Sequence, residues 1–133
     1  MRYLLLAILT LSAVSCATAP PITTFVIRHH NQPDVDGQFV VRTSDPALIA
    51  AARQQLALPV EQRKLHVNGV LAAGNGGFNQ PWSWHVEDGQ WQLAEMSMEV
   101  CDGWPKFVEQ NLDYWLKNVK RLCPWGSYVA EER

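Results

Sequence analysis

The chain begins with a nearly continuous apolar segment, which limits the folded part of the protein to the residues after it. Arg2 is the only charged residue before a mostly apolar run over residues 3–14, and small residues come directly after this run. A single basic residue, a short hydrophobic run and a small-residue end are typical of a secretory signal sequence. A transmembrane anchor is the alternative, but it needs about 20 apolar residues, and the polar, proline-containing stretch after Cys16 does not supply them. Residues 1–15 are therefore predicted to be a signal peptide.

The end of this segment also suggests a lipid anchor. Residues 13–16 read Ala-Val-Ser-Cys, which resembles a bacterial lipobox, although Ala13 stands where Leu is preferred; ordinary cleavage after Ser15 or Ala17 is the alternative. The chain has three cysteines, and an odd cysteine in an exported protein needs an explanation. Acylation of Cys16 would explain the third cysteine. We expect a secreted, periplasmic or cell-envelope protein, anchored through Cys16 and a tether of residues 16–23.

The length and charge of the remainder exclude several classes of protein. Without residues 1–15 about 118 residues remain, enough for one modest core, and no repeat or second linker divides them. We therefore expect one domain over residues 24–133. The formal net charge is −2, without a basic stripe, so the charge pattern of a nucleic-acid-binding protein is missing. No amphipathic basic helix for membrane adsorption is visible either, so contact with a membrane is expected only through Cys16.

The chain is unusually rich in tryptophan. Six Trp occur in 133 residues. Because Trp buries a large apolar area and keeps one N–H donor, it serves both cores and binding surfaces. Four or five of the six are expected to belong to the core.

The first half of the domain alternates between strand and helix signals. Residues 24–28 and 38–43 are rich in β-branched and aromatic side chains and predict two strands. Asp45 followed by Pro46 predicts the start of a helix, because Asp caps free N–H groups and Pro suits the first helical position. Residues 65–72 predict a third strand.

A hairpin is predicted next. Residues 82–87 and 90–100 flank Asp88-Gly89, a dipeptide suited to a two-residue hairpin turn. This turn would pair Val86 with Trp91. It would also gather five apolar side chains on one face of the sheet: Trp82, Trp84, Val86, Trp91 and Leu93.

The C-terminal part predicts a helix and an edge strand. A broad apolar stripe over residues 104–119 predicts a helix capped by Asp102, and residues 125–130 could add an edge strand. The fold class expected from these elements is α+β. We expect a single antiparallel sheet of about five strands, with two helices packed on one face and one disulfide.

Cys101 and Cys123 would form that disulfide. They flank the predicted last helix, and an exported protein favours the bond. Two free buried thiols are the alternative. A bond that closes a loop of about 22 residues raises the free energy of unfolding by roughly 3 kcal/mol.

Several short motifs occur in an order that resembles a known family. These are Thr-Ser-Asp-Pro at 43–46, His-Val-x-Gly at 66–69, Pro-Trp-Ser-Trp-His at 81–85, Glu-Val-Cys-Asp at 99–102 and Cys-Pro-Trp at 123–125 with Ser127. They resemble the small secreted domain at the N-terminus of a calmodulin-binding, permease-like protein, and its stand-alone copies of the bacterial type. The resemblance supports one domain and the disulfide. It implies no reaction, and calcium regulation transfers to no residue, because residues 34–37 are too short for a calcium loop.

The common catalytic motifs are missing from the sequence. It contains no G-x-S-x-G, no H-E-x-x-H, no P-loop and no CxxC, and we expect no cofactor and no metal site. The polar residues of most interest are Ser83, His85, Glu99 and Asp102, because a His near carboxylates can transfer protons or coordinate an ion.

Two functions from different classes are expected. The first is a non-catalytic binding module that recognises a protein or a carbohydrate through Phe78, Trp82, Trp104 and Trp125. One version of it is an inhibitor of extracellular proteases that presents the Gly74–Pro81 loop to an active-site cleft. The alternative is a small hydrolase or ion-binding domain that uses His85 with Glu99 or Asp102.

Overall fold

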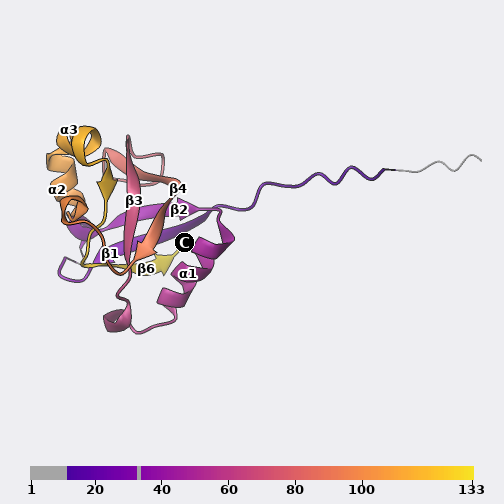
Figure 1. Ribbon diagram of the computed structural model, residues 1–133, viewed down its shortest axis with the longest axis horizontal. Helices are drawn as coiled ribbons and strands as arrows, with labels where there is room; N and C mark the ends of the chain where they lie inside the picture. Colours follow the sequence, from indigo (N-terminus) through magenta and orange to yellow (C-terminus); the bar gives the residue numbers. More distant parts are fainter. Residues whose placement is uncertain (1–11, 33) are drawn as a thin grey trace, which may run out of the picture.

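The computed structural model describes residues 12–32 and 34–133. Most of the predicted signal segment, 1–15, lies outside these residues. Residues 12–22 are exposed, have no regular secondary structure and lead away from the folded domain (Figure 1).

The domain contains two antiparallel sheets of three strands each. The order is β2-β1-β6 in one sheet and β4-β3-β5 in the other. The expectation of a single sheet of about five strands is therefore wrong. The first sheet consists of β1 (Thr23–His29), β2 (Phe39–Thr43) and β6 (Ser127–Glu132), and the second of β3 (His66–Ala73), β4 (Trp84–Ala94) and β5 (Arg121–Leu122).

The two sheets meet along β2 and β4 without sharing a backbone ladder. Alternate backbone groups at the free edge of β2 bond to side chains. The Trp82 indole N–H donates to the Gln38 carbonyl (2.8 Å), and the Trp91 indole N–H donates to the Arg42 carbonyl (2.8 Å). Between them the Val40 N–H donates to Asn79 Oδ1 (2.8 Å). Because these bonds satisfy the edge, no further strand is needed there.

The predicted hairpin at Asp88-Gly89 is also wrong. The residues on both sides of this dipeptide belong to the single strand β4, and both halves pair with β3. Leu71 pairs with Val86 and Gly69 with Trp91, so the segment 87–90 bulges out opposite one residue of β3. Val86 and Trp91 lie five positions apart, which would place them on opposite faces of a regular strand. The bulge lets both side chains enter the core.

An ion pair holds this bulge against the other sheet. Gly89 takes a positive φ of 67° within the bulge, a conformation that costs glycine little. Asp88 accepts two hydrogen bonds from the Arg42 guanidinium of β2, at 3.0 and 2.6 Å. The dipeptide thus connects the two sheets and does not reverse the chain.

The first helix agrees with the sequence. Helix α1 (Pro46–Leu56) begins directly after Asp45, whose carboxylate accepts the Ala47 N–H at 2.9 Å. Its apolar side packs on the core beside β6 and β4, through buried Ala52 and the partly buried Leu48, Ile49 and Leu56.

The second predicted helix, 104–119, is divided into three parts. Helix α2 (Pro105–Gln110) is followed by the short α3 (Leu112–Tyr114) and by a π-helical turn, η4 (Trp115–Val119). The break occurs at Asn111, whose φ of −127° is not helical. Asp102 does not cap α2: its Oδ1 accepts the Trp125 N–H at 2.9 Å. Figure 1 shows α2 and α3 on the opposite side of the strands from α1, so the helices do not share one face.

The core lies between the sheets and beneath the helices, and tryptophan dominates it. Four of the six Trp are buried, as expected: Trp82, Trp84, Trp91 and Trp115. They pack with apolar side chains from both sheets and from α2, including Phe25, Ile27, Phe39, Val41, Val67, Leu71, Val86, Val108, Leu122 and Val129.

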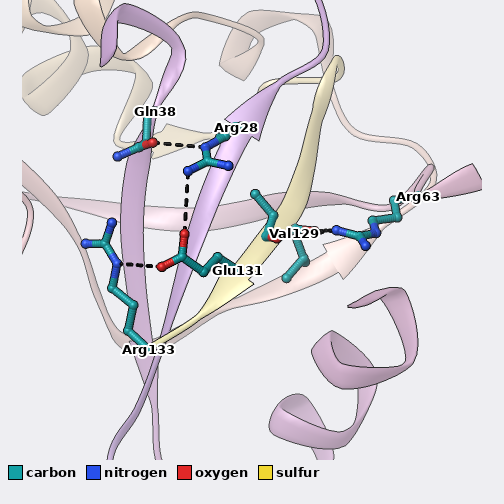
Figure 2. Close-up of polar contacts among 7 residues, drawn as sticks. Arg28, Gln38, Arg63, Val129, Glu131 and Arg133 are labelled. Atoms are coloured by element: carbon teal, nitrogen blue, oxygen red, sulfur yellow. Dashed lines mark hydrogen bonds and ion pairs between the residues drawn. The ribbon is translucent and has the colours of Figure 1, made fainter. Parts of the chain in front are cut away.

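The first sheet carries charged side chains that lie far apart in the sequence. In Figure 2, Arg28 of β1 donates to Gln38 and reaches Glu131 of β6, which also bonds to Arg133. On another side of β6, the Arg63 guanidinium donates to four backbone carbonyls, those of Leu56, Leu58, Val129 and Ala130. Arg63 thereby fastens the connection after α1 to the last strand.

Candidate functional site

The predicted disulfide is present and holds two distant segments together. Cys101 and Cys123 are bonded, with their Cα atoms 5.1 Å apart. Two hydrogen bonds reinforce the link: the Cys123 N–H donates to the Cys101 carbonyl (2.7 Å), and the Trp125 N–H donates to Asp102 Oδ1 (2.9 Å). We call the region formed by residues 95–107 and 121–126 the disulfide end.

Exposed apolar side chains concentrate in this part of the protein. Trp104 and Trp125 are 41% and 46% exposed, and Met96 is 88% exposed. Among the described residues, most of the exposed large apolar side chains belong to the disulfide end or to the helical segment after it: Met96, Met98, Val100, Trp104, Phe107, Tyr114 and Trp125. Such a concentration is a feature of interaction surfaces.

A polar network lies beside these side chains. His66 begins β3 and is only 2% exposed. Its Nε2 lies 2.7 Å from Ser97 Oγ, which also accepts a hydrogen bond from Asn68 Nδ2 at 2.9 Å. Asn68 Oδ1 in turn accepts from Arg121 Nε at 2.9 Å.

The donors in this network determine the orientation of the Asn68 amide. Arg121 can only donate, so Asn68 presents its oxygen to Arg121 and its NH₂ group to Ser97. Ser97 Oγ accepts that bond and keeps one proton and a second lone pair, so the direction of its contact with His66 Nε2 depends on the tautomer of the ring. Burial lowers the pKa of His66, with the Asp102 carboxylate acting weakly in the opposite direction, so the neutral ring is favoured. In the neutral tautomer that carries its proton on Nδ1, His66 accepts the Ser97 hydroxyl proton at Nε2, which is the arrangement of a nucleophile and its general base.

Asp102 also acts on a second histidine at this end. His29 is buried at the end of β1, and its Nδ1 accepts the Asn31 N–H at 3.2 Å. Burial lowers the pKa of His29, and Asp102 opposes this effect. Gly126 packs so closely against the ring that a Cβ at this position would collide with His29 Nε2, so the contact requires glycine.

A small pocket opens on the polar network. Its volume is about 170 Å³, and its lining residues are His66, Glu95, Met96, Ser97 and Trp125. The pocket therefore combines one half-exposed indole, one thioether, the Glu95 side chain and the Ser97–His66 pair.

The structure does not bring together the polar residues predicted from the sequence. His85 Nδ1 lies 2.7 Å from the Gly74 carbonyl, and its ring packs edge-on against Phe78. The Ser83 N–H donates to Glu109. Among the residues that the structure describes, no hydrogen bond or ion pair joins His85 to Glu99 or Asp102. Asp102 instead lies at the disulfide end, near His29 and His66.

The four predicted ligand-binding residues divide into two groups. Trp104 and Trp125 are exposed at the disulfide end, whereas Trp82 is buried and its indole donates to the Gln38 carbonyl, directly before β2. Phe78 is half-buried beneath the Arg42 guanidinium, 4.0 Å from the ring centroid. In the same Gly74–Pro81 loop, Asn79 is fully buried.

His66, Asn68 and Ser97 were not among the site residues predicted from the sequence. His66 and Asn68 alternate with apolar residues within β3, and that spacing places both side chains on one face of the strand. This signal could have identified the pair, but Ser97 lies 29 residues away from Asn68 and joins it only through the fold.

The comparison with protein families supports the resemblance drawn from the motifs. Residues 22–133 match the family described as the BP-74 N-terminal domain. The chain belongs to this family. No curated protein and no solved structure matches the chain. The family match covers both sheets, the helices and the disulfide end, and it adds no reaction or ligand.

Two further observations on the described residues concern membrane spans and metal sites. No helix within residues 12–32 and 34–133 has the length and apolar character needed to cross a bilayer. In the same part of the chain, no group of three or more His, Cys, Asp and Glu side chains is placed to hold a metal ion.

Proposed function

We propose that this domain is an extracytoplasmic binding module that recognises a protein through the disulfide end. The observation that carries the proposal is the exposure of Trp104 and Trp125 on two segments that the Cys101–Cys123 bond holds in place. Exposed tryptophans on a fixed backbone are well suited to be binding hot spots, because little conformational freedom is lost when they are covered.

The chemistry around the two tryptophans favours a protein over a carbohydrate. Met96, Met98, Val100 and Phe107 add thioether, aliphatic and aromatic surface. Flexible thioethers adapt to irregular apolar partners. A sugar would instead need several polar groups arranged around each ring, and the polar groups of this end are largely bonded to one another.

The location outside the cytoplasm is part of the same proposal. The apolar N-terminal segment and the disulfide both support export, because disulfides persist in oxidising compartments. Cys16 is an exposed free thiol in the segment before β1, and we propose it as the lipidated residue. Calmodulin binding and permease-like character stay outside the proposal, because no residue of this chain carries them.

The test compares matched variants in a quantitative capture experiment. The oxidised protein is immobilised and exposed to the extracellular fraction of the producing cells, and the retained protein is identified, purified and titrated by calorimetry. Trp104→Ala and Trp125→Ala should each weaken binding by about tenfold or more. Val60→Ala removes an exposed apolar side chain outside the disulfide end and should leave the affinity unchanged.

Two results would overturn the proposal. Equal affinities for the wild type and both Trp variants would remove the disulfide end as the binding surface. The second result is binding to a glycan array that Trp125→Ala abolishes, with no protein partner whose binding depends on Trp104 or Trp125. The ligand would then be a carbohydrate and not a protein.

A further inference from the structure

We propose that Ser97 is a catalytic nucleophile, with His66 as its general base, and that the adjoining pocket accepts the short acyl group of an ester. This activity is additional to the proposed binding function and does not rest on it. The sequence pointed to His85 with Glu99 or Asp102 for hydrolysis, whereas the fold brings another histidine, from β3, next to a serine in the segment after β4.

The first argument is the geometry of the Ser97–His66 pair. Arg121 orients Asn68, and Asn68 donates to Ser97 Oγ, with both bonds at 2.9 Å. Ser97 Oγ lies 2.7 Å from His66 Nε2, and the tautomer of the ring that leaves Nε2 unprotonated accepts its proton. This geometry is within the range that general-base catalysis requires, before any substrate binds.

The second argument concerns the charges that develop during the reaction. Protonation of His66 creates an imidazolium, which the negative charge of Asp102 stabilises through space. The oxyanion needs N–H donors near Ser97. Within the described part of the chain, no hydrogen bond occupies the backbone N–H groups of Met96, Ser97 and Met98, so these groups are the candidate donors.

The third argument is the size and lining of the pocket. About 170 Å³ beside Ser97 matches the size of a small acyl group. Trp125 and Met96 provide apolar walls for it, and Glu95 completes the lining. The substrate class is therefore an ester of a short carboxylic acid.

The reaction balances without a cofactor. Ser97 Oγ forms a bond to the carbonyl carbon while His66 Nε2 takes the hydroxyl proton. The tetrahedral intermediate collapses, the bond to the alcohol oxygen breaks, and His66 returns the proton to the leaving alcohol. Water then attacks the acyl-serine while giving a proton to His66. Collapse releases the carboxylic acid and restores Ser97 with its proton.

The test uses a small organophosphate that reacts only with activated serines. The oxidised protein is incubated with diethyl p-nitrophenyl phosphate, and intact mass and peptide mapping locate the diethylphosphoryl group. We expect one group on Ser97 and one equivalent of p-nitrophenolate released. Ser97→Ala should abolish both, whereas Ser83→Ala, which removes an exposed serine with no histidine on its hydroxyl, should react like the wild type.

A second set of variants tests the mechanism. His66→Gln should slow the labelling of Ser97 by roughly 10²-fold or more, because the general base is lost. Asn68→Ala leaves His66 in place and should slow labelling several-fold, because Ser97 is no longer oriented. p-Nitrophenyl acetate should be hydrolysed faster than p-nitrophenyl dodecanoate, and only while Ser97 is present.

Three outcomes separate the proposal from its alternatives. If folded, disulfide-bonded protein remains unmodified at Ser97, the hydroxyl is not activated and the proposal is wrong. Labelling that proceeds equally in wild type and His66→Gln, or equally at Ser83 and Ser97, also overturns it. Loss of partner binding in Trp104→Ala with unchanged labelling of Ser97 would support an activity separate from the binding function.

Discussion

Removal of the disulfide should destabilise the domain and disorder its proposed binding surface. Cys101 and Cys123 are 22 positions apart in the sequence. The bond between them closes a loop in the unfolded chain and so lowers the conformational entropy of the unfolded state. The chain-entropy relation gives about 11 cal/mol/K for a loop of this length, or roughly 3 kcal/mol at 25 °C. The Cys101→Ala, Cys123→Ala double variant should lose about this free energy of unfolding.

Urea denaturation followed by tryptophan fluorescence measures the loss. The midpoint should fall and the slope should rise, because the unfolded chain without the cross-link exposes more surface. The melting temperature should fall by roughly 12 °C for a domain of this size. Cys16→Ser is the matched control, because Cys16 is exposed and lies outside the sheets. It should unfold like the wild type.

Hydrogen exchange tests the local consequence. The N–H groups of Cys123 and Trp125 donate to the Cys101 carbonyl and to Asp102, so their protection should fall more than that of β1 in the double variant. A loss below 1 kcal/mol, or protection that falls uniformly over the domain, would refute the view that the bond fixes the disulfide end.

The remaining predictions concern the junction between the sheets and the buried histidines. Asn79→Ala should lower the free energy of unfolding, measured by urea denaturation, by about 2–4 kcal/mol, because the Val40 N–H and the Trp84 carbonyl both lose their buried partner. Gln80→Ala changes an exposed neighbour and should lower the free energy of unfolding only slightly. Equal losses in the two variants would contradict the role assigned to Asn79. Burial lowers the pKa values of His29 and His66 below 6.5 in the folded state, so below pH 6.5 the unfolded chain binds more protons and the free energy of unfolding falls. The urea midpoint should therefore be lower at pH 5.5 than at pH 7.5, with a smaller difference in His66→Asn; a higher midpoint at pH 5.5 would refute the burial argument.

Local signals predicted several elements correctly. Asp45-Pro46 marked the start of α1 because capping depends only on neighbouring residues. β-Branched and aromatic runs marked β1, β2, β3 and the C-terminal edge strand. The disulfide was also predicted correctly, since its two cysteines had few other uses in an exported chain.

Pairing between distant segments was not predicted correctly. Asp88-Gly89 has the composition of a hairpin turn, but both halves of β4 gain more by pairing with β3. The bulge then places Val86 and Trp91 in one core, which a local turn signal cannot specify. The apolar stripe over residues 104–119 also did not indicate that the last helix breaks at Asn111.

The sequence by itself determined the properties that depend on residue type and short spacing. These are an apolar N-terminal segment, a Trp-rich single domain, a cysteine pair and the absence of common catalytic motifs. Only the tertiary structure decided which polar residues meet. Ser83 and His85 are close in sequence but their side chains have different partners, whereas Ser97 and His66 lie 31 residues apart and are in hydrogen-bond contact. The physical reason is that strand pairing sets these contacts through backbone register, which no single residue encodes.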